Sequence, residues 1–155
     1  MERKIILITG ATGGIGKEAA RVLAKQGHRV IPHGRDKNKT QAALLELEKD
    51  TGNDQMGMLL ADLESFAEIK RMADAFKQKY DHLDVLMNNA GNQYGGTREL
   101  TLEGHERTMA VNTFAPFLLT FLLLDPLSKS GEGRVVTVSS ASHAQGGAPY
   151  LHVNG

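Results

Sequence analysis

Glycine residues in the segment TGATGGIGKEAA, residues 9–20, could bring the backbone close to a ligand. Gly10, Gly14 and Gly16 lie between the apolar run Ile5–Ile8 and a segment whose apolar residues have helical spacing. Glycine at such positions allows a tight turn, and the pyrophosphate of a ligand would then lie at the N-terminus of the helix. A glycine-rich turn between a buried strand and an amphipathic helix predicts a dinucleotide-binding site.

Other chemistries fit the residues less well. A P-loop for nucleoside triphosphates needs glycine at position 11 and a hydroxyl side chain at position 18, where the chain has Ala11 and Glu18. Neither Ser139 nor Ser140 is framed as Gly-x-Ser-x-Gly, so the hydrolase pattern is absent. The six histidines show no zinc-type spacing, and His143, three residues after Ser140, is interpreted as an incidental loop residue.

The elements that must position these residues alternate between short apolar runs and segments with helical periodicity. The sequence predicts strands at Ile5–Ile8, from Val30, at Met56–Leu60, at 83–91 and at 134–140, with a long last helix over Thr101–Leu124. The alternation predicts an α/β fold with a doubly wound parallel sheet and helices on both faces. The second half of the long helix is apolar nearly all round, so we expect it to be buried on several sides.

Composition and charge limit the class of protein. No linker interrupts the 155 residues, which predicts one domain over residues 1–155. The 18 basic and 18 acidic residues balance, which favours neither nucleic acid nor an anionic membrane as a partner. The longest apolar segment, Phe114–Leu124, is about half of a membrane span. We therefore expect a soluble, cytoplasmic protein.

Four motifs, in this order, resemble the short-chain dehydrogenase/reductase (SDR) family. They are Thr9-Gly-x-x-x-Gly14-x-Gly16, Asn88-Asn89-Ala90-Gly91, Asn112 on the long helix and Ser140 after the fifth strand. The resemblance covers the whole chain, and RVVTVSSASH at 134–143 is most similar to the retinol-dehydrogenase-like branch. It implies a Rossmann-type sheet in the strand order 3-2-1-4-5 and hydride transfer between NAD or NADP and an alcohol or carbonyl.

The resemblance also implies roles for single residues around the cofactor. The residues of the glycine turn would line the pyrophosphate: Gly10, Thr12, Gly13, Gly14, Ile15 and Gly16. Asp62 and Leu63, after the third strand, would meet the adenine edge, although Asp62 could instead only cap the following turn. Asn89, Ala90 and Gly91 would pass beside the adenosine ribose, and Asn89 would also tie neighbouring strands together.

Two residues would belong to the catalytic centre by the same resemblance. Ser140 would donate a hydrogen bond to the substrate carbonyl. Asn112 would mark a distorted helix whose freed backbone carbonyl holds a water in a proton relay, the alternative being a plain asparagine on a helix face. Pro116, four residues on, has no N–H for the Asn112 carbonyl and therefore favours the distorted helix.

The residue at the end of the second strand is expected to select the cofactor. An acidic side chain about 20 residues beyond the glycines would bind the ribose 2′-hydroxyl of NAD. The chain has Gly34 where the family commonly places that residue, followed by Arg35, whose guanidinium would suit the 2′-phosphate of NADP, with Lys39 as a helper. We predict NADP, with NAD left open because Asp36 follows directly. Pro32 cannot donate within an interior strand, so this strand is expected to be short or bulged.

The family's proton donor, a tyrosine with a lysine four residues later, has no match in the chain. Tyr150 is the only tyrosine after Ser140, and Asn154 stands where the lysine would be. We therefore expect the Tyr-x-x-x-Lys motif and the last strands of the sheet to fall beyond Gly155. The fifth strand would then be an exposed edge.

The sequence predicts an NADP(H)-dependent short-chain oxidoreductase that interconverts an alcohol and a carbonyl. Its partner would be that small-molecule substrate, with no nucleic acid, no membrane span, and assembly into homo-oligomers left open. Two rivals remain: a non-catalytic NAD(P)-binding module, and a fragment that does not fold alone. Without the tyrosine and lysine, we expect the 155-residue chain by itself to show no measurable carbonyl reduction.

Overall fold

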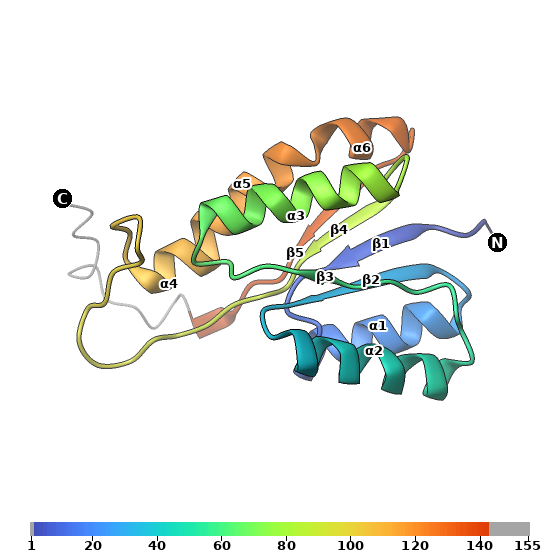
Figure 1. The fold of residues 1–155 in the computed structure, drawn as a ribbon, viewed down its shortest axis with the longest axis horizontal. Helices are drawn as coiled ribbons and strands as arrows, with labels where there is room; N and C mark the ends of the chain where they lie inside the picture. Colours follow the sequence, from blue (N-terminus) through green and yellow to red (C-terminus); the bar gives the residue numbers. More distant parts are fainter. Residues whose placement is uncertain (1, 143–155) are drawn as a thin grey trace.

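A computed structural model of the chain describes residues 2–142, which contain a five-stranded sheet (Figure 1). In chain order the strands are β1 (Ile5–Ile8), β2 (Arg29–Gly34), β3 (Leu59–Leu60), β4 (Val85–Asn88) and β5 (Arg134–Thr137). Their order across the sheet is β3-β2-β1-β4-β5, and every neighbouring pair is parallel. The predicted strand order and the Rossmann-type fold are confirmed.

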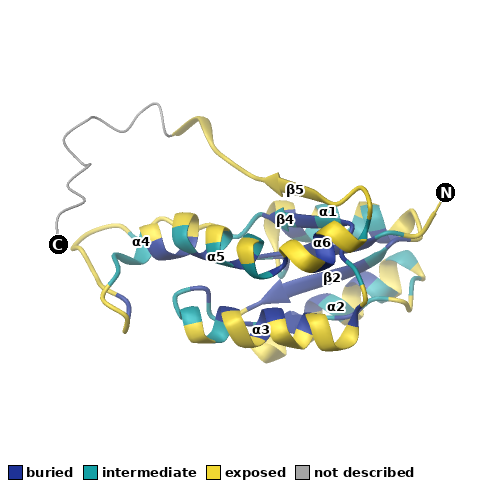
Figure 2. Ribbon diagram, turned by 90° about the horizontal axis from the view of Figure 1, so that it is seen from above, coloured by how far each residue is buried: buried dark blue, intermediate teal, exposed yellow. Residues whose placement is uncertain are grey.

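The helices cover both faces of the sheet (Figures 1 and 2). One face carries α1 (Gly14–Lys25) and α2 (Lys37–Thr51). The other face carries α3 (Phe66–Lys79), α4 (Arg107–Met109), the π-helix η1 (Ala110–Phe114), α5 (Ala115–Leu122) and α6 (Leu124–Lys129). Within the part of the chain that the structure describes, no helix is both long and apolar enough to cross a membrane.

Strand β1 contributes to two hydrophobic cores, which explains its unbroken apolar run. Ile5 and Leu7 pack in the core that β1 shares with α3 and α5, whereas Ile6 and Ile8 pack in the core beneath α1 and α2. Successive side chains of a strand point to opposite faces, so four apolar residues in a row are needed to bury both faces. None of the four is more than 9% exposed.

Strand β2 has six residues and a continuous register with β1, so the expectation of a short or bulged strand is wrong. The reason is the direction in which Pro32 faces. The carbonyl oxygen of Gly34 accepts a hydrogen bond from Ala61 N–H at 3.2 Å, so Pro32, two residues earlier, also faces the β3 side. An N–H at position 32 would point toward β3, so proline at this position removes no hydrogen bond between β2 and β1. The third strand is shorter than the predicted Met56–Leu60 and contains only two residues.

The long helix predicted over Thr101–Leu124 begins later and is interrupted. Its first turn starts at Arg107, because the carboxylate of Glu106 accepts hydrogen bonds from two backbone N–H groups and caps the helix. Residues Ala110–Phe114 then form a π-helix, in which the N–H of Ala115 donates to the carbonyl five residues earlier. The element is therefore three short helices in series, with α6 following.

The π-helix confirms the predicted distortion at Asn112. Pro116 lies near the start of α5 and has no N–H, so the α-helical hydrogen bond to the Asn112 carbonyl cannot form. The turn at this point contains one more residue than an α-helical turn, and its hydrogen bond spans five residues instead of four. Such single-turn π-bulges occur frequently at functional sites.

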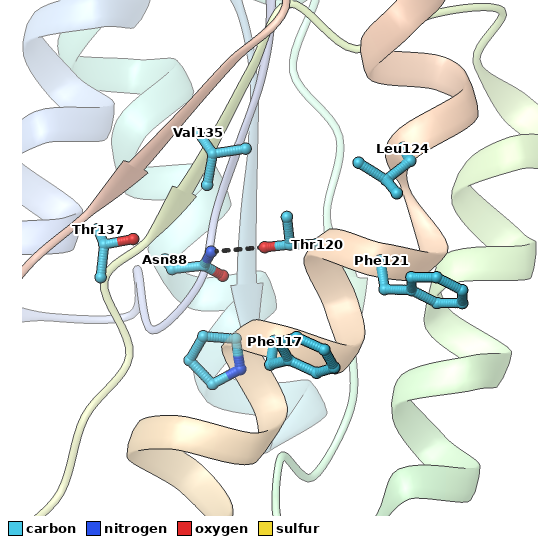
Figure 3. Close-up of a pocket in the computed structure, with 8 residues that line it drawn as sticks. Asn88, Phe117, Thr120, Phe121, Leu124, Val135 and Thr137 are labelled. Atoms are coloured by element: carbon cyan, nitrogen blue, oxygen red, sulfur yellow. Dashed lines mark hydrogen bonds between the residues drawn. The ribbon is translucent and has the colours of Figure 1, made fainter.

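Burial on several sides, expected for the second half of that helix, is wrong for the described residues. Leu119 of α5 is 1% exposed and packs in the core with α3, whereas Phe117 and Phe121 are 76% and 63% exposed. Together with Leu124 and Val135 these phenylalanines line an apolar groove between α5, α6 and β5 (Figure 3). Strand β5 is exposed along its whole length, in agreement with the expected open edge (Figure 2).

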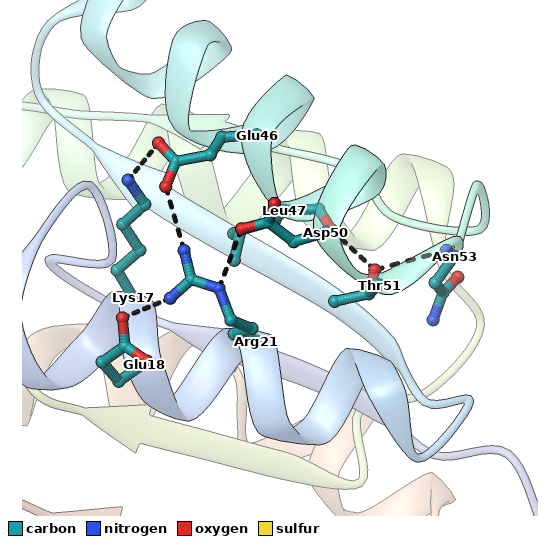
Figure 4. Close-up of polar contacts among 8 residues, drawn as sticks. All are labelled: Lys17, Glu18, Arg21, Glu46, Leu47, Asp50, Thr51 and Asn53. Atoms are coloured by element: carbon teal, nitrogen blue, oxygen red, sulfur yellow. Dashed lines mark hydrogen bonds and ion pairs between the residues drawn. The ribbon is translucent and has the colours of Figure 1, made fainter.

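A network of ion pairs holds α1 against α2 (Figure 4). Arg21 of α1 contacts the carboxylates of Glu46 at 2.9 Å and Asp50 at 3.1 Å on α2, and it also pairs with Glu18. Lys17 pairs with Glu46 as well. Because α1 begins in the glycine turn, this network fixes the helix end that lies next to the candidate site.

Candidate functional site

The carboxyl ends of β1, β2 and β4 surround a cavity of about 310 Å³. Residues predicted to contact the cofactor line it, namely Gly10, Thr12, Arg35, Asp62, Leu63, Asn89, Ala90 and Gly91. The rest of the lining comprises His33, Gly34, Ala61, Asn92, Tyr94 and Val111. Ligands of open α/β sheets bind at this edge, where the strand order reverses.

The glycine turn approaches the loop after β4 so closely that only glycine fits. A Cβ on Gly10 would lie 2.8 Å from the Cα of Ala90, and the φ of Gly10 is +64°. A Cβ on Gly16 would lie 2.4 Å from Nδ2 of Asn89. The turn and the loop therefore form two walls of the cavity that touch each other.

Other residues predicted for the pyrophosphate lie at the N-terminus of α1 and not on the cavity lining. These are Gly13, Gly14, Ile15 and Gly16. Gly13 is the N-cap residue with an extended backbone, and Ile15 is 70% exposed. The first turn of a helix presents backbone N–H groups and the positive end of the helix dipole, which favour an anion. Their contact with a pyrophosphate stays a prediction.

Asn89 ties β4 to the glycine turn, as predicted. Its Nδ2 group donates hydrogen bonds to the carbonyl oxygens of Thr9 at 3.0 Å and Gly10 at 3.2 Å. In return, the hydroxyl oxygen of Thr9 accepts from the backbone N–H groups of Asn89 and Ala90, both at 3.0 Å. Four hydrogen bonds thus hold the two walls together independently of any ligand.

Asp62 closes the turn after β3 and also lines the cavity, and its contact with an adenine edge stays a prediction. Its Oδ1 accepts a hydrogen bond from Glu64 N–H at 2.9 Å and so closes the turn after β3. The same residue lines the cavity, next to Leu63, which is 8% exposed and packs in the core shared with α3. The loop that would meet the adenine is thus anchored by its own turn and by an apolar side chain.

The structure separates the two candidates for selecting the cofactor. Arg35 lines the cavity, whereas Asp36 is the N-cap of α2 and its Oδ1 accepts a hydrogen bond from Lys39 N–H at 2.8 Å. A side chain at Gly34 would have to displace two threonine side chains, because a Cβ there would lie 2.2 Å from Thr40 Oγ1 and 2.5 Å from Thr12 Cγ2. Lys39 is not among the residues that line the cavity.

The side chain of Asn112 braces the loop after β4, a contact that sequence reasoning missed. Its Oδ1 accepts from Asn92 N–H at 2.8 Å, and its Nδ2 donates to the Asn92 carbonyl at 2.7 Å. The amide therefore pairs with a peptide group as a neighbouring strand would. The water relay predicted at the backbone carbonyl of Asn112 stays a prediction.

Ser140 follows β5 and lies at the carboxyl edge of the sheet, but it does not line the cavity. It is exposed, and its Oγ is 2.9 Å from the Oγ of Ser142 and accepts a hydrogen bond from Ser142 N–H at 3.1 Å. Its contact with a substrate carbonyl stays a prediction. His143 and Tyr150 lie outside the described residues.

A cluster around Tyr94 closes one side of the cavity. The guanidinium of Arg107 lies 4.0 Å from the centre of the Tyr94 ring and pairs with the Glu64 carboxylate at 2.8 Å and with Glu99. Burial raises the pKa of Tyr94, and its hydrogen bond to Glu64 raises that pKa further, so this phenol is a poor proton donor. The members come from separate elements, and no local pattern in the sequence indicated the cluster.

Comparison with known proteins places this geometry in context. The family model described as short chain dehydrogenase matches residues 4–151. Retinol dehydrogenase 12 of Homo sapiens is 41% identical over 147 residues, covering 95% of this chain and 46% of that protein. Polyprenol dehydrogenase of Homo sapiens is 40% identical over 144 residues, covering 90% of this chain and 43% of that protein. The chain thus spans about half the length of the curated relatives it matches.

Solved structures give the same fold. A short-chain dehydrogenase from Sphingobium yanoikuyae in complex with NADPH superposes with a TM-score of 0.75 at 32% identity, covering 89% of this chain and 54% of that one. The RhlG/NADP active-site complex of Pseudomonas aeruginosa gives a TM-score of 0.77 at 31% identity, covering 88% and 54%. Both of these structures contain the NADP type of cofactor.

Proposed function

This chain belongs to the short-chain dehydrogenase family, in its retinol-dehydrogenase-like branch, and we propose that it forms the nucleotide-binding part of an NADP(H)-dependent oxidoreductase. The reaction is the interconversion of an alcohol and a carbonyl. The cofactor supplies or accepts the hydride at its nicotinamide ring. The residues described above bind and orient it.

The observation that carries the proposal is the position of Arg35. It lines the cavity directly after Gly34, where a side chain would have to displace those of Thr40 and Thr12, and Asp36 is engaged in capping α2. An acidic side chain would bind the 2′-hydroxyl of NAD, whereas a guanidinium forms charge-assisted hydrogen bonds with a 2′-phosphate. The NADP and NADPH complexes among the similar structures support the same choice.

Each wall of the cavity would then contact a different part of the cofactor. The glycine turn and the N-terminus of α1 hold the pyrophosphate, and Asp62 and Leu63 hold the adenine edge. Asn89, Ala90 and Gly91 pass beside the ribose. Ser140 and the backbone carbonyl of Asn112 serve the reacting end, the first by orienting the substrate carbonyl and the second by holding a water for proton transfer.

The choice of cofactor is tested by substituting Arg35. NADPH should bind more tightly than NADH, and Arg35→Ala should weaken NADPH binding by about 1.5–3 kcal/mol, or about 10- to 150-fold in Kd, with NADH nearly unchanged. Isothermal titration or NADPH fluorescence measures both affinities. Arg29→Ala is the matched control, because Arg29 starts the same strand and its guanidinium contacts Gln55 at 3.2 Å, away from the cavity. Equal affinities in the unmodified chain would contradict the proposal.

A second candidate is a nucleotide-binding module without turnover. In these 155 residues no tyrosine has a lysine four residues later. An assay of NADPH oxidation with a panel of aldehydes and ketones separates the two candidates. Turnover by the 155-residue chain that disappears on Tyr150→Phe would identify Tyr150 as the proton donor and exclude the module.

A further inference from the structure

One buried histidine at the cavity has no role in the proposed function so far. His33 lies near the end of β2, lines the cavity and is 2% exposed. Its Nδ1 accepts a hydrogen bond from Gly10 N–H at 3.1 Å, and its Nε2 is 2.9 Å from the Ala61 carbonyl oxygen. Its own carbonyl accepts from Ala11 N–H at 2.9 Å. One residue thus contacts the loops that follow both neighbouring strands.

The partners of the ring determine its protonation state. The N–H of Gly10 can only donate, so Nδ1 must be without a proton. The carbonyl of Ala61 can only accept, so Nε2 must carry the proton. The imidazole is therefore the neutral Nε2–H tautomer, and a proton added at Nδ1 would face the Gly10 N–H. Burial lowers the pKa of His33 from its ordinary value, which favours the same neutral form.

The two loops joined by His33 are the glycine turn and the Ala61–Leu63 loop, two walls of the cavity that a dinucleotide would bridge. Gly10 opens the glycine turn and has a left-handed backbone, with a φ of +64°. Ala61 directly precedes Asp62 and Leu63, which line the other wall. A side chain that contacts both loops through two nitrogens in one rigid ring fixes the separation of the loops. A longer or more flexible side chain would not fix it.

We propose that His33 is a positioning residue for cofactor binding, which as the neutral Nε2–H tautomer holds the glycine turn and the Ala61–Leu63 loop at the separation that NADP(H) spans. This rests on the proposed function, since it assumes the pyrophosphate on one wall and the adenine on the other. The ring acts through the two loops and does not react itself.

Substitution of His33 should weaken NADPH binding by more than its effect on stability would explain. His33→Phe keeps a planar ring but leaves Gly10 N–H and the Ala61 carbonyl without partners, and we expect NADPH to bind about tenfold more weakly or worse. His33→Asn keeps an acceptor near Gly10, and His33→Gln keeps a donor near Ala61, so each should restore part of the affinity. Adenosine 2′-monophosphate, which lacks the pyrophosphate that would contact the glycine turn, should lose little affinity in any of the three variants.

The matched control is the other buried histidine at β2. His28 is 6% exposed and its Nδ1 accepts from Lys4 N–H at 3.3 Å, at the opposite end of the strand from the cavity. His28→Phe should lower the melting temperature but leave the NADPH affinity of the folded protein unchanged. The role of His33 would be overturned if NADPH affinity fell equally in His33→Phe and His28→Phe. It would also be overturned if NADPH affinity fell in neither variant.

A measurement on the unmodified chain tests the same proposal without relying on a variant that folds. Nitrogen-15 NMR of the histidine rings should show the His33 imidazole as the neutral Nε2–H tautomer at pH 7. A protonated ring or an Nδ1–H tautomer at His33, assigned in the unmodified chain by correlating the ring with its own backbone, would overturn the proposal. Absence of NADPH binding in the unmodified chain would instead overturn the proposed function itself, so the two failures are distinguishable.

Discussion

The two ends of the sheet differ in what surrounds them. At the nucleotide end, formed by β1, β2 and the glycine turn, Leu7, Val30 and Ile31 are fully buried and the turn is hydrogen-bonded from two sides. At the groove end, formed by β5 and the outer face of α5, all four strand residues are exposed, and so are Phe117 and Phe121 (Figures 2 and 3).

The difference shows where the geometry of the site is determined. At the nucleotide end, each wall of the cavity has several independent partners within the described residues, so the cavity has its shape before any cofactor arrives. Side chains at the groove end have solvent on one side and can change without displacing a neighbour. Substitutions at the nucleotide end should therefore change the free energy of unfolding far more than substitutions at the groove end.

The largest effect is expected for Gly10→Val at the nucleotide end. Its Cβ would lie 2.8 Å from the Ala90 Cα, a backbone atom that cannot move aside, and the φ of +64° strains any branched side chain. We expect a loss of about 3 kcal/mol or more in the free energy of unfolding, and no NADPH binding by the fraction that folds. Urea unfolding followed by circular dichroism measures the loss.

Gly13→Ala is the control within the same turn. Nothing lies within 4 Å of a Cβ at Gly13, and its backbone is extended with a φ of −168°, which any residue adopts. The substitution should change the free energy of unfolding by less than about 0.5 kcal/mol. Equal destabilisation by both variants would show that the turn does not touch the loop after β4.

A smaller effect, dependent on pH, is expected from His33. Burial holds its pKa below the ordinary value of about 6.5, although the Ala61 carbonyl and the charge of Asp62 act in the opposite direction. Below that pH the unfolded chain binds a proton at this residue and the folded chain does not, so the stability falls as the pH decreases.

Through His33 the free energy of unfolding can change by at most about 1.4 kcal/mol per pH unit. Above pH 7 the stability contributed by this residue should be constant. Urea unfolding at several values between pH 7.5 and pH 5 measures the slope, and His33→Phe should make it shallower. An unchanged slope in that variant would mean that His33 binds its proton equally in both states.

The nucleotide end was largely predictable from the sequence because its signals are local. The unbroken run Ile5–Ile8 indicated a strand covered on both faces, and the glycines after it indicated a tight turn whose backbone could approach a ligand. Pro116 indicated the interrupted helix, since a missing N–H acts on a carbonyl four residues away. Each of these inferences needed only residues that are neighbours in the chain.

The errors arose where the outcome depends on which neighbour a residue faces. Pro32 was expected to shorten or bulge β2. An N–H at this position would face β3 and not β1, and the sequence alone does not show which neighbouring strand a residue faces. His33 and Arg107 acquire their partners from other loops, so their roles appeared only in the structure. The apolar pattern of α5 correctly indicated a helix but could not show which of its faces is covered.

The smallest effect is expected at the groove end, for the double variant Phe117→Gln and Phe121→Gln. Both rings are more than half exposed, so little apolar area is lost from a buried environment and glutamine is a good helix former. The free energy of unfolding should change by less than about 0.5 kcal/mol, while solubility rises because an apolar groove beside an open strand edge favours self-association.

Leu119→Ala on the same helix is the contrast, since Leu119 is 1% exposed and its truncation should cost about 2–5 kcal/mol. Urea unfolding and analytical ultracentrifugation measure the two quantities. A loss above about 2 kcal/mol in the double variant would show that the groove is covered in solution, and the contrast between the two ends of the sheet would then disappear.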